Sequence, residues 1–129
     1  DPPLVLFSID RKALSLPLWE RADAFVVNVL AASQSDISNR FANPRGPKWE
    51  GMDYALSPHG APVLAGAAAR FECLPHACHD GGDHGLFVVR GGGYEADFDR
   101  TPLLFCKGRY MRIDPERPSA PSWPLDIHY

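Results

Sequence analysis

The stretch CHDGGDHGLFVVRGG, residues 78–92, joins a polar, glycine-containing segment to a run of strand-forming residues. The pair Gly81–Gly82 permits the positive φ angles that tight turns use. The residues from 85 to 91 are rich in β-branched and aromatic side chains and predict a strand. Asp83 and His84 therefore lie at the lip of a predicted strand, where core packing gives no reason for charged side chains.

The composition indicates one mostly β domain. A chain of 129 residues fits a single domain, and its 13 prolines and 11 glycines favour short strands joined by turns over a helical bundle. The formal charge of −3, with interspersed signs, argues against binding to nucleic acid or to an anionic membrane. Three cysteines fit neither a disulfide framework nor a zinc knuckle, so we expect a reducing, cytoplasmic location.

Working outward from residues 78–92, the hydrophobic pattern predicts short strands, two helices and a long connection. Leu14, Leu18 and Ala22 recur at a four-residue step, which predicts an amphipathic helix. The small residues 65–69 indicate close approach of another backbone or of a planar ligand. The predicted strands are 4–9, 25–30, 63–74, 85–91, 102–108 and 109–113; the helices lie within 13–24 and 33–42, the connection spans 43–62, and GGG at 91–93 is a predicted turn.

His84 has two interpretations. A histidine at the start of a strand is often hydrogen-bonded and inert. With Asp83 beside it, however, the carboxylate fixes the orientation of the imidazole and favours its charged form. Such a histidine can carry positive charge or transfer a proton near neutral pH, so we favour a functional role.

Three other features also have alternative interpretations. Asn28 either is satisfied by a neighbouring turn or offers its donor and acceptor to the edge of a heterocycle. Arg11 and Lys12 form a solvated turn unless a nucleotide phosphate lies there. Residues 76–84 crowd together histidine, cysteine and aspartate, but they lack the separated ligand pairs of zinc sites, so we predict no metal.

Five blocks carry a resemblance to a known family: DPPLVLFSIDRK (1–12), FVVNVLAASQSDISNRFA (25–42), KWEGMDY with GAPVLAGAAARFEC (48–54 and 60–73), HDGGDHGLFVVR (79–90) and TPLLFCKGRYMRI (101–113). In order and spacing they resemble the flavin-reductase-like proteins, the small NAD(P)H:flavin oxidoreductases of two-component monooxygenases. The resemblance implies a mostly β split β-barrel of the FMN-binding type over residues 1–113, with a few short helices and without the family's N-terminal strands. Residues 114–129 would form a Pro-rich tail.

The resemblance also implies an activity: hydride passes from NADH or NADPH to FMN or FAD, and the reduced flavin then serves a monooxygenase. It implies a homodimer. Two alternatives of the same fold remain: a protein with tightly bound FMN that reduces another acceptor, such as a ferric chelate or a corrinoid, and a non-catalytic flavin-binding module.

The same resemblance implies roles for individual residues. His84, oriented by Asp83, would position the nicotinamide and stabilise the charge that develops as hydride leaves. Tyr110 would line the same pocket, and Phe41 would pack near the flavin ring. The remaining flavin contacts would come from Asp10, Arg11 and Lys12 on the ribityl phosphate or adenylate side, and from Asn28, Val29, Leu30, Ser33 and Gln34 beside the isoalloxazine.

Overall fold

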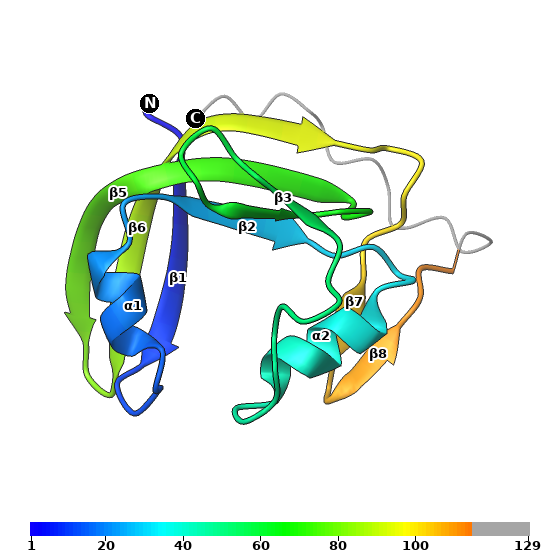
Figure 1. Ribbon diagram of the computed structural model, residues 1–129, viewed down its shortest axis with the longest axis horizontal. Helices are drawn as coiled ribbons and strands as arrows, with labels where there is room; N and C mark the ends of the chain where they lie inside the picture. The colour runs from blue at the N-terminus through cyan, green and yellow to red at the C-terminus, as the bar shows by residue number, and fades with distance from the viewer. Residues whose placement is uncertain (115–129) are drawn as a thin grey trace.

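The computed structural model describes residues 1–114, which form a mostly β structure with two short helices (Figure 1). The helices are α1 (Leu16–Arg21) and α2 (Ser35–Ala42). The strands are β1 (Leu4–Asp10), β2 (Phe25–Val29), β3 (Tyr54–Leu56), β4 (Pro62–Leu64), β5 (Ala69–Gly81), β6 (His84–Ala96), β7 (Leu104–Cys106) and β8 (Arg109–Met111). The predicted fold class is confirmed. The predicted Pro-rich tail, 114–129, lies outside the described residues except for Asp114.

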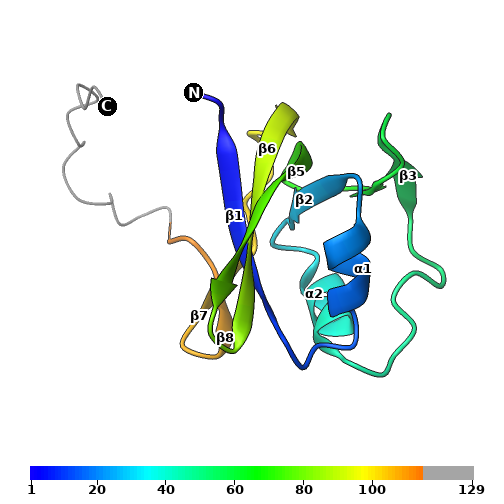
Figure 2. The same ribbon diagram turned by 90° about the vertical axis from the view of Figure 1, so that its left-hand side faces the viewer.

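One curled sheet holds the structure together. Its strand order is β1-β6-β5-β2, and each neighbouring pair is antiparallel. β5 and β6 are thirteen residues each and pair from the turn at Gly81–His84 to Ala69–Ala96, so they bend as one ribbon (Figure 1). The pairs β3–β4 and β7–β8 form two separate hairpins. Figure 2 shows α1 against one face of the sheet.

The core forms on the face of the sheet that α1 covers. Phe87 and Val89 on β6 are 4% and 1% exposed, as expected from the two-residue alternation of a strand with one buried face. The ring of Phe7 stacks on that of Phe87 at 5.3 Å between centroids. Trp19 of α1 lies 5.5 Å from Phe7 and 6.1 Å from Phe25, so this indole attaches the helix to the sheet.

Two predicted boundaries are wrong. The connection 43–62 contains β3 and the start of β4, and the predicted strand 63–74 is interrupted after Leu64, since β5 begins only at Ala69. β5 then continues to Gly81 through polar residues that carry no strand pattern. They are extended because β6 provides a partner for each of them except His76, which lies at a register shift; this pairing is a long-range contact that local propensity does not report.

The predicted turn at 91–93 is also wrong, because these glycines lie within β6. Gly91 pairs with Cys73 and Gly93 pairs with Glu72, which leaves Gly92 as the extra residue of a β-bulge. A Cβ on Gly91 would lie 3.6 Å from the ring of Pro3, which is an ordinary van der Waals contact, so packing at this position does not require a glycine.

We expect Phe87→Ala to lower the free energy of unfolding by about 3–5 kcal/mol, since it removes a ring stacked in the core and leaves a cavity. Urea unfolding followed by circular dichroism measures this. Phe98→Ala is the matched control, because Phe98 is 95% exposed and its loss should change stability by no more than about 0.5 kcal/mol. Equal effects of the two substitutions would contradict the assignment of the core.

Candidate functional site

Asp83 and His84 lie at the tip of the β5–β6 hairpin. Gly81 pairs with His84, so the loop consists of only Gly82 and Asp83. Gly82 has a φ of +76°, which a type II′ turn requires at its first central position. A Cβ on Gly81 would lie 2.9 Å from the side chain of Leu86, so a glycine is needed there as well. The two consecutive glycines thus set the shape of the tip.

The imidazole of His84 is oriented and accessible. Its Nδ1 lies 2.8 Å from Oδ1 of Asp83, and its side chain is 40% exposed. Hydrogen bonding to His84 holds the pKa of the Asp83 carboxyl below its ordinary value, so this group is ionised near neutral pH. Nδ1 is the ring nitrogen bonded within residues 1–114, which leaves Nε2 available to an incoming group.

The end of β1 lies directly beside this tip. Asp10 is the register partner of His84, and Lys12 donates its backbone N–H to Oδ1 of Asp10 at 2.7 Å. Arg11 donates its backbone N–H to the carbonyl of Asp83 at 2.9 Å. The fold therefore brings together five predicted site residues from two distant stretches, which we call the tip cluster: Asp10, Arg11, Lys12, Asp83 and His84.

A second set of predicted residues, which we call the β2–α2 group, lies at the far end of β2. Asn28 accepts the backbone N–H of Leu64 at 3.0 Å and donates to the carbonyl of Pro62 at 3.3 Å. Gln34, which is 9% exposed, accepts the N–H of Ala31 and donates to the carbonyl of Ala65 at 2.7 Å. Both amides thus fasten β4 and the following turn to β2 and α2. The group is completed by Val29, Leu30 and the exposed Ser33.

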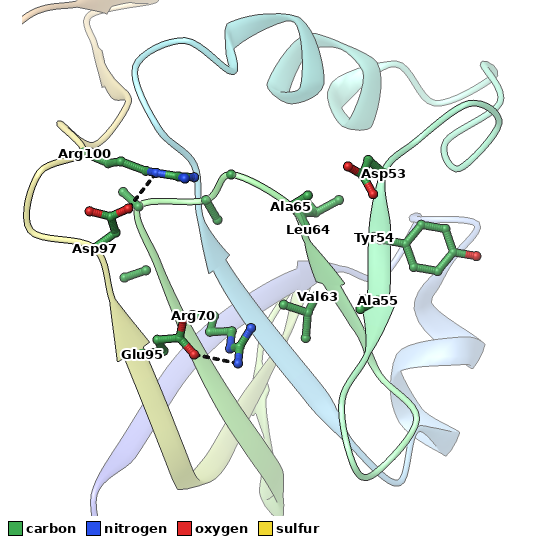
Figure 3. Close-up of a pocket in the computed structure, with 14 residues that line it drawn as sticks. Asp53, Tyr54, Ala55, Val63, Leu64, Ala65, Arg70, Glu95, Asp97 and Arg100 are labelled. Carbon is green, nitrogen blue, oxygen red and sulfur yellow. Dashed lines mark ion pairs between the residues drawn. The ribbon is translucent and has the colours of Figure 1, made fainter.

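A hollow of about 320 Å³ adjoins the β2–α2 group (Figure 3). Its floor is the small-residue turn from Ala65 to Ala69, between β4 and β5. Gly66 has a φ of +75°, and a Cβ there would lie 3.2 Å from the amide nitrogen of Gln34. Arg70 pairs with Glu95 at 2.7 Å and Arg100 pairs with Asp97 at 2.8 Å along its sides. A floor that has no side chain larger than a methyl group suits a flat group.

Phe41 and Tyr110 lie apart from both of these groups, beside α2. The ring of Phe41 packs edge-on against Trp49 at 5.0 Å. The hydroxyl of Tyr110, on β8, donates to Oδ1 of Asn39 at 2.8 Å, so this residue joins the β7–β8 hairpin to α2. Within residues 1–114, no hydrogen bond or ion pair joins the tip cluster to either α2 or the β2–α2 group.

One residue at the tip was missed by the sequence interpretation. Asp80 accepts the N–H of Gly82 at 3.1 Å and the guanidinium of Arg11 at 2.6 Å. An aspartate two residues before a turn glycine is a known local signal for such a bond.

Residues 1–114 contain neither a metal-binding group nor a membrane-spanning helix. In the part of the chain described, no three histidine, cysteine, aspartate or glutamate side chains are grouped to bind an ion. No helix in residues 1–114 is long and apolar enough to cross a bilayer.

Comparison with known proteins identifies relatives of the whole described region. Residues 1–114 match the family described as Flavin reductase like domain. HsaB of Rhodococcus jostii (strain RHA1), the reductase subunit of a flavin-dependent monooxygenase, is 36% identical over 127 residues, which cover 98% of this chain and 65% of HsaB. SmoA of Agrobacterium fabrum, an FMN reductase (NADH), is 36% identical and matches over 88% of this chain and 64% of SmoA. The chain thus spans about two thirds of the length of these relatives.

Solved structures agree. A homolog of nitrilotriacetate monooxygenase component B from Mycobacterium thermoresistibile superposes with a TM-score of 0.89 at 35% identity, covering 100% of this chain and 73% of that one. NADH:FAD oxidoreductase SgcE6 from Streptomyces globisporus gives 0.84 at 33% identity, with 90% and 71% covered, and it has also been solved with NAD and FAD fragments. Together with the curled sheet, these matches confirm the predicted split barrel.

We expect the Asp83 carboxyl to titrate below the ordinary range of aspartate, and His84→Ala to raise its pKa toward that range, because the substitution removes the main cause of the shift. NMR detection of the carboxyl carbon during a pH titration measures both values. Since the pKa is lowered in the folded state, the pair stabilises the fold above the unfolded pKa and loses this effect as pH falls through the folded value. An Asp83 pKa that His84→Ala leaves unchanged would contradict the pairing.

Proposed function

Because the chain belongs to the flavin-reductase-like family over residues 1–114, as its sequence motifs suggested, we propose that it is an NAD(P)H:flavin oxidoreductase that transfers hydride from NADH or NADPH to FMN or FAD. Two relatives support this: one is named an FMN reductase (NADH) and another an NADH-dependent FAD reductase. The proposal extends to delivery of reduced flavin to a monooxygenase, because HsaB is named as such a reductase subunit.

The observation that carries the proposal is the imidazole at the hairpin tip. His84 is partly exposed, bonded through Nδ1 to an ionised carboxylate, and held on a loop of two residues. An imidazole fixed in this way can hold a polar group of the nicotinamide and stabilise the positive charge that grows on the pyridine as hydride leaves. Asp83 serves as the group that orients it.

The β2–α2 group and the adjoining hollow fit a flavin. The floor from Ala65 to Ala69 has no large side chain, and the positive φ of Gly66 favours a glycine at this position. The flavin, when bound, supplies the ring that accepts the hydride. Asn28 and Gln34 use their amides to hold this floor, and the carbonyls of Val29 and Leu30 accept the N–H groups of Ala68 and Leu103. We therefore assign the contacts with the ring to Ser33 and to the half-buried side chains of Val29 and Leu30.

The remaining predicted residues take supporting roles in the proposal. Asp10 and Lys12 are exposed at the tip cluster and would face the ribityl phosphate or adenylate side. Phe41 is 37% exposed and would pack near the ring, and Tyr110 would line the pocket from β8. The three cysteines of the chain, Cys73, Cys78 and Cys106, are free thiols, which supports the proposed cytoplasmic location.

We expect NADH oxidation by the purified chain to need added FMN or FAD, and His84→Ala to reduce kcat/KM for NADH by about tenfold to a hundredfold with flavin affinity almost unchanged. Stopped-flow absorbance at the flavin band measures the first, and fluorescence titration of FMN measures the second. A flavin that copurifies tightly would favour the second function, reduction of another acceptor. Absence of NADH oxidation with every flavin would leave only the binding module.

The proposal includes a homodimer, and the outer face of β1 supports it. β1 is an edge strand whose Leu4 and Leu6 are 50% and 63% exposed. Leu6 pairs in register with Val88 of β6, which is only half-buried, so the apolar surface continues onto the next strand. An apolar sheet face next to an open strand edge is a frequent contact between subunits.

We expect Leu6→Glu to convert the dimer to a monomer without loss of the fold, because it puts a charge into the proposed interface but not into the core. Light scattering after size exclusion gives the mass. Leu18→Glu is the matched control, since Leu18 on α1 is 65% exposed and lies away from β1. A wild-type monomer, or dissociation by both variants, would contradict this interface.

A further inference from the structure

We infer that Arg11 is a positioning residue which, together with Asp80, holds the β5–β6 turn in the orientation that presents His84. The importance of His84 for turnover rests on the proposed function. The contacts of Arg11 with the turn do not depend on that function, so an experiment can contradict the positioning role and the proposed function separately. No ligand is required for this role, unlike the phosphate contact that the family resemblance implies for Arg11.

Arg11 reaches the turn through three separate hydrogen bonds, which we call the Arg11 bridge. Its backbone N–H bonds the carbonyl of Asp83 at 2.9 Å, and its Nε bonds the carbonyl of Gly82 at 2.7 Å. Its Nη2 lies 2.6 Å from Oδ1 of Asp80. The two residues of the loop and the carboxylate just before it are therefore all fastened to the end of β1.

Apart from the strand pairing and the bonds of Gly82 to Asp80 and of His84 to Asp83, the tip has few contacts that hold it. Asp80, Gly82 and Asp83 are exposed, so no apolar burial stabilises this end of the hairpin. The two consecutive glycines widen the conformational freedom of the turn. The planar guanidinium can satisfy a carbonyl and a carboxylate at fixed angles, which a lysine ammonium cannot do with the same geometry.

The charges around Arg11 also favour positioning over phosphate binding. Arg11 holds the pKa of the Asp80 carboxyl below its ordinary value, so the carboxylate is ionised beside the guanidinium. This pairing offsets the positive charge that a phosphate would need, and the carboxylate itself would repel a phosphate. Arg11 is 47% exposed and Asp80 is 80% exposed, so the bridge is a modest contact that adjusts geometry.

The test compares Arg11→Ala, Asp80→Ala and the double variant in the full chain. We expect each single variant to raise KM for NADH roughly fivefold, with the Kd for FMN unchanged. The KM of the double variant should be no higher than that of the more affected single variant, because each substitution alone already breaks the Arg11–Asp80 bridge. Hydrogen exchange of residues 80–86, read by mass spectrometry, should speed up in all three. Arg21→Ala is the control: Arg21 is also exposed and bonds a carbonyl through Nε, but on α1.

Three outcomes would overturn an assignment. If Arg11→Ala weakens FMN binding while Asp80→Ala does not, Arg11 is a phosphate ligand and the inference is wrong. Unchanged hydrogen exchange in both single variants would show that the bridge does not hold the turn. If the wild-type chain oxidises no NADH but exchange still speeds up in the variants, the bridge stands and the proposed function falls.

Discussion

The antiparallel pairing of β5 with β6 is the constraint on which the rest of the structure depends. Thirteen residues on each strand bend together, and the sheet is completed by β1 on the outer side of β6 and β2 on the outer side of β5. The alternation along β6 puts Phe87 and Val89 into the core, where aromatic rings attach α1. The bulge at Gly92 adds an unpaired residue beyond this alternation, where it allows the ribbon to bend.

The same pairing determines where polar chemistry is available. At the turn the hairpin leaves the core, so charged side chains can sit there without a desolvation cost, and an imidazole bonded to a carboxylate stays accessible. At the other end of β2, by contrast, the amides of Asn28 and Gln34 are used within the protein, where they fasten β4 and the small-residue turn. Asn28 and Gln34 therefore support the hollow beside α2 without lining it, and five small residues, Ala65 to Ala69, form one side of it.

Local pattern was enough for the short apolar strands β1 and β2 and for the presence of both helices. The apolar face predicted for α1 is wrong, because Leu14 and Leu18 are exposed and Trp19 packs on the sheet instead. It failed for the far half of β5 and for the glycines of β6, because their extension is imposed by a partner strand. The position of Asp83 and His84 in the site could be predicted from the sequence, because a glycine pair stands directly before a strand. Asp80 also carries a local signal, since it stands two residues before a turn glycine, but its ion pair with Arg11, 69 residues away, does not.

The proposed function requires the imidazole of His84 at the hairpin tip to contact the pyridine of the reduced dinucleotide, and this pyridine must stack directly on the flavin for hydride to pass. A crystal structure of the protein with FMN and a non-reactive NADH analogue tests it most directly. The account predicts the nicotinamide ring in contact with the imidazole of His84, with Asp83 still bonded to Nδ1. A nicotinamide bound elsewhere, with His84 exposed and free of contact, would contradict it.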